Sequence, residues 1–160
     1  MTDPVEQLAR DDKWQLGAGD GTLFAPEFPR WLDAAGFWDG ATVMRRAVAP
    51  LFTVTVLDDE GREIAARLTA RRWTPAELTS QYRLGLGITA TEVRTVHPGG
   101  IFVSEWRFAA YRPARIHLVA WTAQRGSRVE RGSAIWNGAL QFVLAAKRSE
   151  ADDAPMRVRA

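Results

Sequence analysis

The sequence of 160 residues contains no cysteine and only two histidines, His97 and His117. The absence of cysteine excludes disulfide scaffolds, thiolate zinc sites and cysteine nucleophiles. Two histidines are few for a histidine-based metal site, and we predict no metal and no cofactor. The sequence also lacks any run of about 18 apolar residues, and residues 1–13 are polar and acidic where a signal peptide is basic and then apolar. We therefore predict a cytoplasmic protein with no membrane partner.

Lysine is scarce as well, because the chain has 19 arginines but only 2 lysines, and its net charge is +2. The arginines are spread along the chain, with short pairs at Arg45–Arg46 and Arg71–Arg72. A nucleic-acid surface needs a clustered basic patch or stripe. We therefore expect no nucleic-acid partner.

Aromatic residues gather in the segment Gly17–Gly40, which we call the aromatic segment. Three of the seven tryptophans and three of the seven phenylalanines lie between positions 14 and 38, among glycines and prolines that prevent a long helix or a regular central strand. Trp31 lies near Asp33 and Trp38 beside Asp39, as in sugar-binding surfaces where rings stack on a pyranose and acids accept its hydroxyl protons. These four residues are the candidate ligand or interface contacts. The alternative is a loop held onto the core by its own aromatics.

The glycines of residues 17–22 do not have the context of a phosphate-binding loop. No strand precedes them, no lysine closes the motif, and Pro26 and Pro29 disrupt the helix that should follow. Asp20 would also repel a phosphate. We predict instead a turn that leads into a short strand at Thr22–Ala25.

The later two thirds of the sequence alternate between apolar and polar residues with period two, which predicts strands. The predicted strands are residues 51–57, 62–68, 80–84, 88–96, 101–110 and 115–123. The first two are expected to form a hairpin about the turn Asp58–Gly61. Thr74–Glu77 is expected to open one helical turn with Thr74 as its N-cap.

The strongest predicted hairpin joins residues 88–96 to residues 101–110 through His97–Gly100, whose proline and glycines favour a turn. The residues assigned to the core face of its second strand are Phe102, Ser104, Trp106 and Phe108. Glu105 and Arg107 fall on the opposite face.

The last apolar run, residues 133–147, fits either a helical stripe or one face of a strand, and Asn137–Gly138 within it favours a strand or a bulge. Trp106, Trp121 and Trp136 recur at intervals of fifteen residues. This spacing indicates a meander of antiparallel strands that brings each ring to a comparable depth.

These patterns predict an all-β fold of about eight to ten strands, arranged as an antiparallel two-sheet sandwich or, alternatively, as a closed β-barrel. The expected organisation is a flexible N-terminus at residues 1–13, a single domain at 14–147, and a polar tail or linker at 148–160.

Catalytic residues are not evident in the sequence. A serine triad needs a histidine base, but one histidine sits in a Pro-Gly turn, where we expect it to be exposed, and the other on a strand, where we expect it to be half-buried. Glu92 and Glu105 flank the His97–Gly100 turn and could act as a glycosidase carboxylate pair. Arg94 and Arg107 favour a cross-strand charge ladder instead. We therefore predict no catalytic residue.

The order of these signals resembles the N-terminal β-sandwich (supersandwich) domain of glucoamylase-like and debranching-type glycoside hydrolases. The matching pieces are LGAGDGTLFAPEFPRWLDAAGFWDG, FTVTVLDDEGREI, RRWTPAELTSQYRL and ITATEVRTVHPGGIFVSEWRF. Together they run from about residue 14 to residue 146.

In that family the catalytic acid and base belong to a helical barrel, so the resemblance implies a noncatalytic accessory domain of a carbohydrate-active protein. Such a domain would support a catalytic barrel or contact a glycan through the aromatic segment, and it would be a glycoside hydrolase only as part of a longer enzyme. Two alternatives stay open. One is a small β-barrel that holds an apolar ligand in its interior, and the other is a self-associating protein with the aromatic segment as its homodimer contact.

Overall fold

The computed structural model describes residues 14–26, 34–38, 40–48 and 51–121, together with the backbone of three strands at 127–130, 133–136 and 140–143. These described residues form fourteen strands and one short 3-10 helix, η1 (Gly85–Gly87), so the all-β prediction is confirmed. The expected number of strands was too low, because many strands have only two or three residues. Within these ranges no helix has the length and apolar character needed to cross a membrane. The predicted flexible ends, 1–13 and 148–160, lie outside the described residues.

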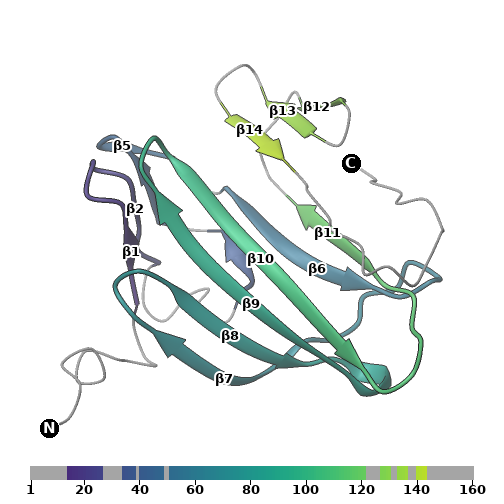
Figure 1. Ribbon diagram of the computed structural model, residues 1–160. Helices are drawn as coiled ribbons and strands as arrows, with labels where there is room; N and C mark the ends of the chain where they lie inside the picture. Colours follow the sequence, from purple (N-terminus) through teal and green to yellow (C-terminus); the bar gives the residue numbers. More distant parts are fainter. Residues whose placement is uncertain are drawn as a thin grey trace, which may run out of the picture. The chain divides into compact units, whose positions relative to one another are not determined.

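The chain falls into two units that divide between Thr122 and Ala123. The first unit contains three antiparallel sheets (Figure 1). The meander sheet has the order β10-β9-β8-β7 and consists of β7 (Arg67–Trp73), β8 (Leu78–Arg83), β9 (Ile88–His97) and β10 (Ile101–Ala110). The β6 sheet has the order β11-β6-β3 and consists of β3 (Gly36–Phe37), β6 (Phe52–Leu57) and β11 (His117–Trp121). The N-terminal sheet has the order β1-β2-β4-β5 and consists of β1 (Leu16–Gly17), β2 (Leu23–Phe24), β4 (Ala41–Val43) and β5 (Arg46–Ala47).

The core of the first unit lies between the meander sheet and the β6 sheet. Val56 of β6 belongs to one buried cluster with Tyr82, Leu84, Ile88 and Ala90, which lie in or beside β8 and β9. Burial alternates along β6, β8 and β9, as expected for strands with one face against the core.

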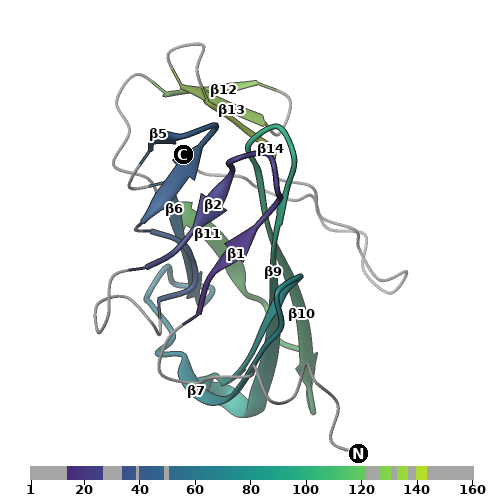
Figure 2. The same ribbon diagram turned by 90° about the vertical axis from the view of Figure 1, so that its left-hand side faces the viewer.

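Aromatic rings connect all three sheets of this unit. Phe37 of β3 is fully buried, and its ring centroid lies 4.9 Å from that of Phe24 in β2 and 5.2 Å from that of Phe102 in β10. The meander sheet therefore forms one layer, and the two smaller sheets share the other (Figure 2). The antiparallel sandwich prediction is confirmed. None of the sheets formed by the described strands closes into a barrel, so the alternative of a closed barrel is wrong for this part of the chain.

The β9–β10 hairpin forms as predicted. Its ladder runs without a register shift from Ile88↔Ala110 to His97↔Ile101, and Gly99 and Gly100 adopt positive φ in the turn. The side chains assigned to the core face of β10 are half-buried, whereas those of the other face are exposed.

The turn Asp58–Gly61 forms, but the hairpin predicted around it is limited to one bridge and the hydrogen bonds beside it. The Asp58 carboxylate accepts hydrogen bonds from the main-chain N–H groups of Glu60 and Arg62, and a single bridge, Leu57↔Glu63, follows. Ile64 then packs against the core cluster between the layers, and the chain continues into the meander sheet. A turn motif specifies the reversal of the chain but not which sheet the next strand joins.

Thr74–Glu77 is a hairpin connection between β7 and β8, so the predicted helical turn is wrong. The N-cap hydrogen bond does occur, because the Glu77 N–H donates to Thr74 Oγ1 over 3.1 Å. The Thr74 N–H also donates to the Glu77 carbonyl, and Trp73 pairs with Leu78 directly outside the turn. Strand pairing on both sides leaves no residues for a helix.

The second unit contains one antiparallel sheet of order β12-β13-β14, formed by β12 (Ser127–Glu130), β13 (Ser133–Trp136) and β14 (Leu140–Val143). The last apolar run thus supplies two strands rather than a helix or one long strand.

The expected common depth of the tryptophans is wrong for Trp121, which is 51% exposed, whereas Trp106 is half-buried. Their strands, β11 and β10, lie in different sheets.

Candidate functional site

The structure describes one of the four predicted contact residues. Trp38 directly follows β3 and is half-buried. Trp31, Asp33 and Asp39 lie outside the described residues, and their roles stay predictions.

The described flanks of the aromatic segment are anchored in the core. Phe24 is 2% exposed and Phe37 fully buried, and the Ala25 N–H donates to the Gly40 carbonyl over 3.1 Å. Gly36 and Gly40 have positive φ, and a Cβ added at either would lie within 3.0 Å of a neighbouring carbonyl oxygen. These flanks match the alternative interpretation, in which the segment is held by its own aromatics.

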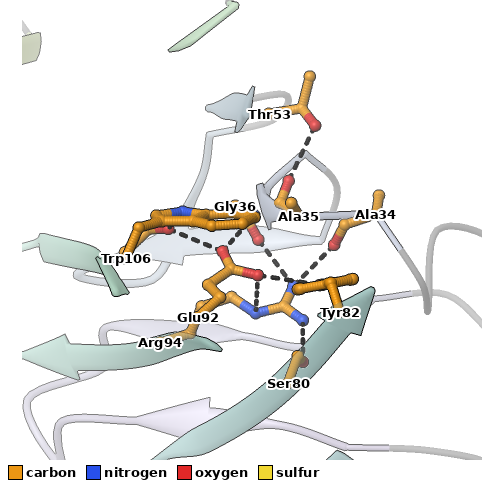
Figure 3. Close-up of polar contacts among 10 residues, drawn as sticks. Ala34, Ala35, Gly36, Thr53, Ser80, Tyr82, Glu92, Arg94 and Trp106 are labelled. Carbon is orange, nitrogen blue, oxygen red and sulfur yellow. Dashed lines mark hydrogen bonds and ion pairs between the residues drawn. The ribbon is translucent and has the colours of Figure 1, made fainter. Parts of the chain in front are cut away.

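A buried ion pair lies on the inner face of β9. Glu92 is 0% exposed and Arg94 is 1% exposed, and Arg94 Nε lies 3.5 Å from Glu92 Oε2. Both side chains project toward the opposite layer, at the place where the main chain of Ala34–Gly36 enters β3 (Figure 3). We call this pair the Glu92–Arg94 clamp.

The carboxylate of Glu92 accepts hydrogen bonds from three elements. Its Oε1 accepts from the Gly36 N–H and from Ser104 Oγ, each over 2.7 Å, and its Oε2 accepts from the Tyr82 hydroxyl over 3.1 Å. The Trp106 indole N–H donates to Ser104 Oγ over 2.9 Å, which extends the network along β10. Such donors compensate a buried carboxylate for the water that it loses.

The guanidinium of Arg94 completes the clamp from the other side. Its Nη1 donates to the carbonyls of Ala34 and Gly36 over 2.8 and 3.0 Å, and its Nη2 donates to Ser80 Oγ over 3.1 Å. Its central carbon also lies 4.7 Å from the ring centroid of Trp14, a cation–π distance. The planar fork of arginine makes these several bonds possible at once.

Burial and the neighbouring Glu92 carboxylate raise the pKa of Tyr82 well above its usual value of 10.0. The ring of Tyr82 stacks on that of Trp106, with centroids 5.5 Å apart. The hydroxyl therefore stays protonated and remains a donor to Glu92.

The clamp positions main chain and has no open access to a substrate. The carboxylate is enclosed, and its oxygens are occupied by donors from the protein. The clamp instead fixes the main chain of Ala34 and Gly36 against the meander sheet. These two residues come soon after residues 27–33 of the aromatic segment.

Sequence reasoning missed this clamp and paired Glu92 with Glu105 instead. The two carboxylates lie on opposite faces of the hairpin, since Glu92 is buried and Glu105 is exposed, so the glycosidase pair is wrong. The cross-strand charge ladder is also wrong, because Glu105 pairs with Arg107 of its own strand over 2.8 Å. The sequence did contain a sign of this buried pair. Glu92 and Arg94 lie on the same face of β9 as the apolar residues Ile88, Ala90 and Val96.

The two histidines are both exposed. This confirms the expectation for His97, whose Nε2 lies 3.0 Å from Thr95 Oγ1, and corrects that for His117, which was expected to be half-buried. Among the described residues, no group of three histidine or acidic side chains is placed to hold a metal ion.

A second polar contact ties two turns together. Asp20, between β1 and β2, accepts hydrogen bonds from the Thr22 N–H over 2.9 Å and from the Gly99 N–H over 2.7 Å. The hydrogen bonds from the Gly99 main chain and from Thr22 lower the pKa of Asp20. This is the turn predicted for residues 17–22, although the strand that follows is shorter than expected.

Comparisons of the chain with protein-family models, with curated proteins and with solved structures each find no match. The resemblance to a glycoside hydrolase domain therefore rests on the sequence pattern alone.

Proposed function

We propose that this chain is a noncatalytic β-sandwich domain of a carbohydrate-active protein. It presents residues 27–33 of the aromatic segment, together with Trp38, to a glycan or to a helical catalytic domain that it supports. The observation that carries the proposal is the Glu92–Arg94 clamp, which fixes the main chain directly after residues 27–33.

Fixing the main chain at Ala34 and Gly36 favours recognition by the adjoining segment, because a chain whose attachment is fixed before binding loses less conformational entropy when it binds. Asp33 is the residue before the clamped Ala34, and Trp31 lies two residues further back. On the other side of β3, Trp38 follows the buried Phe37. The candidate contacts thus border positions that the core holds fixed.

A noncatalytic role is supported by where the acids of the meander sheet lie. Glu92 is enclosed by its donors, and Glu105 is engaged with Arg107 on the outer face. Glycoside hydrolysis needs two carboxyl groups that face one substrate across about 5–10 Å. These two do not converge on one space.

Glycan contact is tested by titrating the full chain with malto-oligosaccharides while tryptophan fluorescence is followed. We expect a saturable change that Trp31→Ala and Trp38→Ala each weaken. Trp121→Ala is the matched control, because Trp121 is a 51% exposed tryptophan on β11, outside the aromatic segment, and its loss should leave the affinity unchanged. No change at millimolar ligand would remove the glycan part of the proposal.

Support of a catalytic domain is tested separately by sedimentation of the chain with the isolated helical barrel of a glucoamylase-like enzyme. We expect a complex that Trp31→Ala or Trp38→Ala weakens and that Trp121→Ala leaves intact. Absence of both glycan binding and barrel binding would sink the proposed function as a whole.

The alternative of a barrel that holds an apolar ligand loses its premise in the described part of the chain. The three sheets of the first unit are open, and buried aromatic and aliphatic side chains lie between the layers.

A further inference from the structure

Among the described strands, β10 forms an edge of the meander sheet, and it has neither the bulge nor the proline that commonly protects an edge. Among the described strands it pairs only with β9. It has ten residues, an unbroken register, no proline and no lysine. Natural sheets usually protect such a strand with a bulge, a proline or several charges, because its free main-chain groups can pair with another strand.

The opposite edge of the same sheet shows that protection. Strand β7 carries three arginines, Arg67, Arg71 and Arg72, and its register shifts between Leu68 and Ala70. Charge and a local irregularity discourage further pairing there. Within the part of the chain that the structure describes, the contrast makes β10 the edge that is available to a partner.

The outer face of β10 is apolar at its ends and charged in its middle. Ile101 is 56% exposed and Val103 is 37% exposed, and Tyr111, directly after the strand, is 95% exposed. Between them, Glu105 and Arg107 form an exposed ion pair. These charges lie on either side of Trp106 in the sequence, so the strand is complementary in charge to an antiparallel copy of itself.

We propose that two copies of this chain associate through β10, antiparallel, with the two-fold axis at Trp106. In this register Glu105 lies opposite Arg107 of the partner subunit, and Arg107 lies opposite Glu105 of the partner subunit. Oppositely charged side chains directly across an antiparallel pair are favourable, and like charges there are unfavourable. A two-fold axis makes each favourable contact occur twice.

The charges also specify the register. Moving the axis by one residue toward the start of β10 places Glu105 opposite its own copy, and moving it by one residue toward the end places Arg107 opposite its own copy. Both alternatives set like charges against each other. The preferred register brings the half-buried Trp106 rings of the two copies together, a cross-strand aromatic pair of the kind that stabilises sheets. The two meander sheets then form one continuous sheet.

Charge reversal in the full chain tests this interface by sedimentation equilibrium over a concentration series. We expect the wild type to dimerise, and Glu105→Arg and Arg107→Glu each to weaken dimerisation at least about tenfold, since either change sets like charges opposite each other at two places. An equimolar mixture of the two variants should associate, because one supplies two arginines and the other two glutamates. The double variant Glu105→Arg/Arg107→Glu should dimerise like the wild type.

The variants separate an interface effect from a folding effect. Both side chains are more than half exposed, at 54% and 71%, so circular dichroism and thermal unfolding of each variant should match the wild type. A wild type that stays monomeric would overturn the proposal. So would a dimer that both single variants leave unchanged, or single variants that fail to associate when mixed. None of these outcomes depends on glycan binding.

Discussion

The two ion pairs of the β9–β10 hairpin are built from the same residue types at the same spacing. Glu92–Arg94 and Glu105–Arg107 each join a glutamate to an arginine two residues later, on neighbouring strands. The first pair faces the core and the second faces outward. The exposed pair has the shorter contact, 2.8 Å against 3.5 Å.

Burial and shared partners, rather than the distance between the charges, decide what an ion pair contributes to stability. Both members of the exposed pair keep their water, and such pairs contribute about 0–1 kcal/mol to the free energy of unfolding. The buried pair has lost its water, and hydrogen bonds from Gly36, Tyr82 and Ser104 replace it around the carboxylate. Removing one partner there leaves a charge without compensation.

The largest effect is expected from Arg94→Met. It should lower the free energy of unfolding by about 3–5 kcal/mol, because the buried Glu92 carboxyl group loses its partner. The matched control Arg107→Met should lower it by no more than about 1 kcal/mol. Urea denaturation of dilute protein measures both values. Equal losses in the two variants would contradict the comparison.

Tyr82→Phe removes the hydroxyl that donates to Glu92 and should lower the free energy of unfolding by about 1.5–3 kcal/mol at neutral pH, as for a hydrogen bond to a charged group. The pKa of Tyr82 is raised in the folded protein, so the folded state keeps a proton that the unfolded chain releases above pH 10.0. Wild-type stability should therefore be complete below pH 10 and fall above it by about 1.4 kcal/mol per pH unit.

In Tyr82→Phe, the free energy of unfolding should fall less steeply with pH above pH 10, by about 1.4 kcal/mol per pH unit. Tyr111→Phe is the control, since that side chain is 95% exposed and its removal should leave the slope as in the wild type. Denaturant titrations between pH 9 and pH 11 give the comparison. A slope that survives in Tyr82→Phe would assign the titration to another group.

A double-mutant cycle sharpens the contrast further. Glu92→Leu combined with Arg94→Met should cost at least about 1 kcal/mol less than the sum of the single losses, because the double variant leaves no buried charge unpaired. The same cycle on Glu105 and Arg107 should show coupling below about 0.5 kcal/mol. Additivity at the buried pair would show that the two side chains act independently.

The smallest effect is expected at Asp20, a carboxylate that accepts two main-chain hydrogen bonds at an exposed position. Asp20→Asn should speed hydrogen exchange at the Gly99 N–H, and Asp58→Asn, in the other Asp turn, should not. The pKa of Asp20 is lowered in the folded protein, so the contribution of this carboxylate to stability is present above pH 3.8. It is lost as the pH falls through the pKa that Asp20 has in the folded protein. If hydrogen exchange at the Gly99 N–H is unchanged in Asp20→Asn, then hydrogen bonds to an exposed carboxylate add little to local stability.

Local patterns predicted which face of β10 is inside and where its hairpin turns. Alternation over ten residues and the Pro-Gly-Gly turn were enough, because both signals act within one hairpin. The same reasoning failed after Asp58–Gly61, where the next strand joins another sheet. It failed again at Thr74–Glu77, where a capping hydrogen bond serves a hairpin.

The clamp could not be assembled from the sequence because its partners are distant. Arg94 binds the carbonyls of residues 60 and 58 positions earlier, and no local rule connects them. The charges at core-facing positions of β9 were a usable signal, since a glutamate and an arginine there must find partners or stay unburied. That signal indicates a buried polar network but not the segment that completes it.

The bonds that the clamp makes to Ala34 and Gly36 end on main-chain atoms, namely two carbonyl oxygens and one N–H. Main-chain groups are the same for almost every amino acid, so the clamp sets no condition on the side chains of the residues before Ala34. Those residues can be exchanged by mutation or design while their attachment to the sandwich is kept. The frame that holds the segment and the side chains that the segment carries can therefore be altered separately.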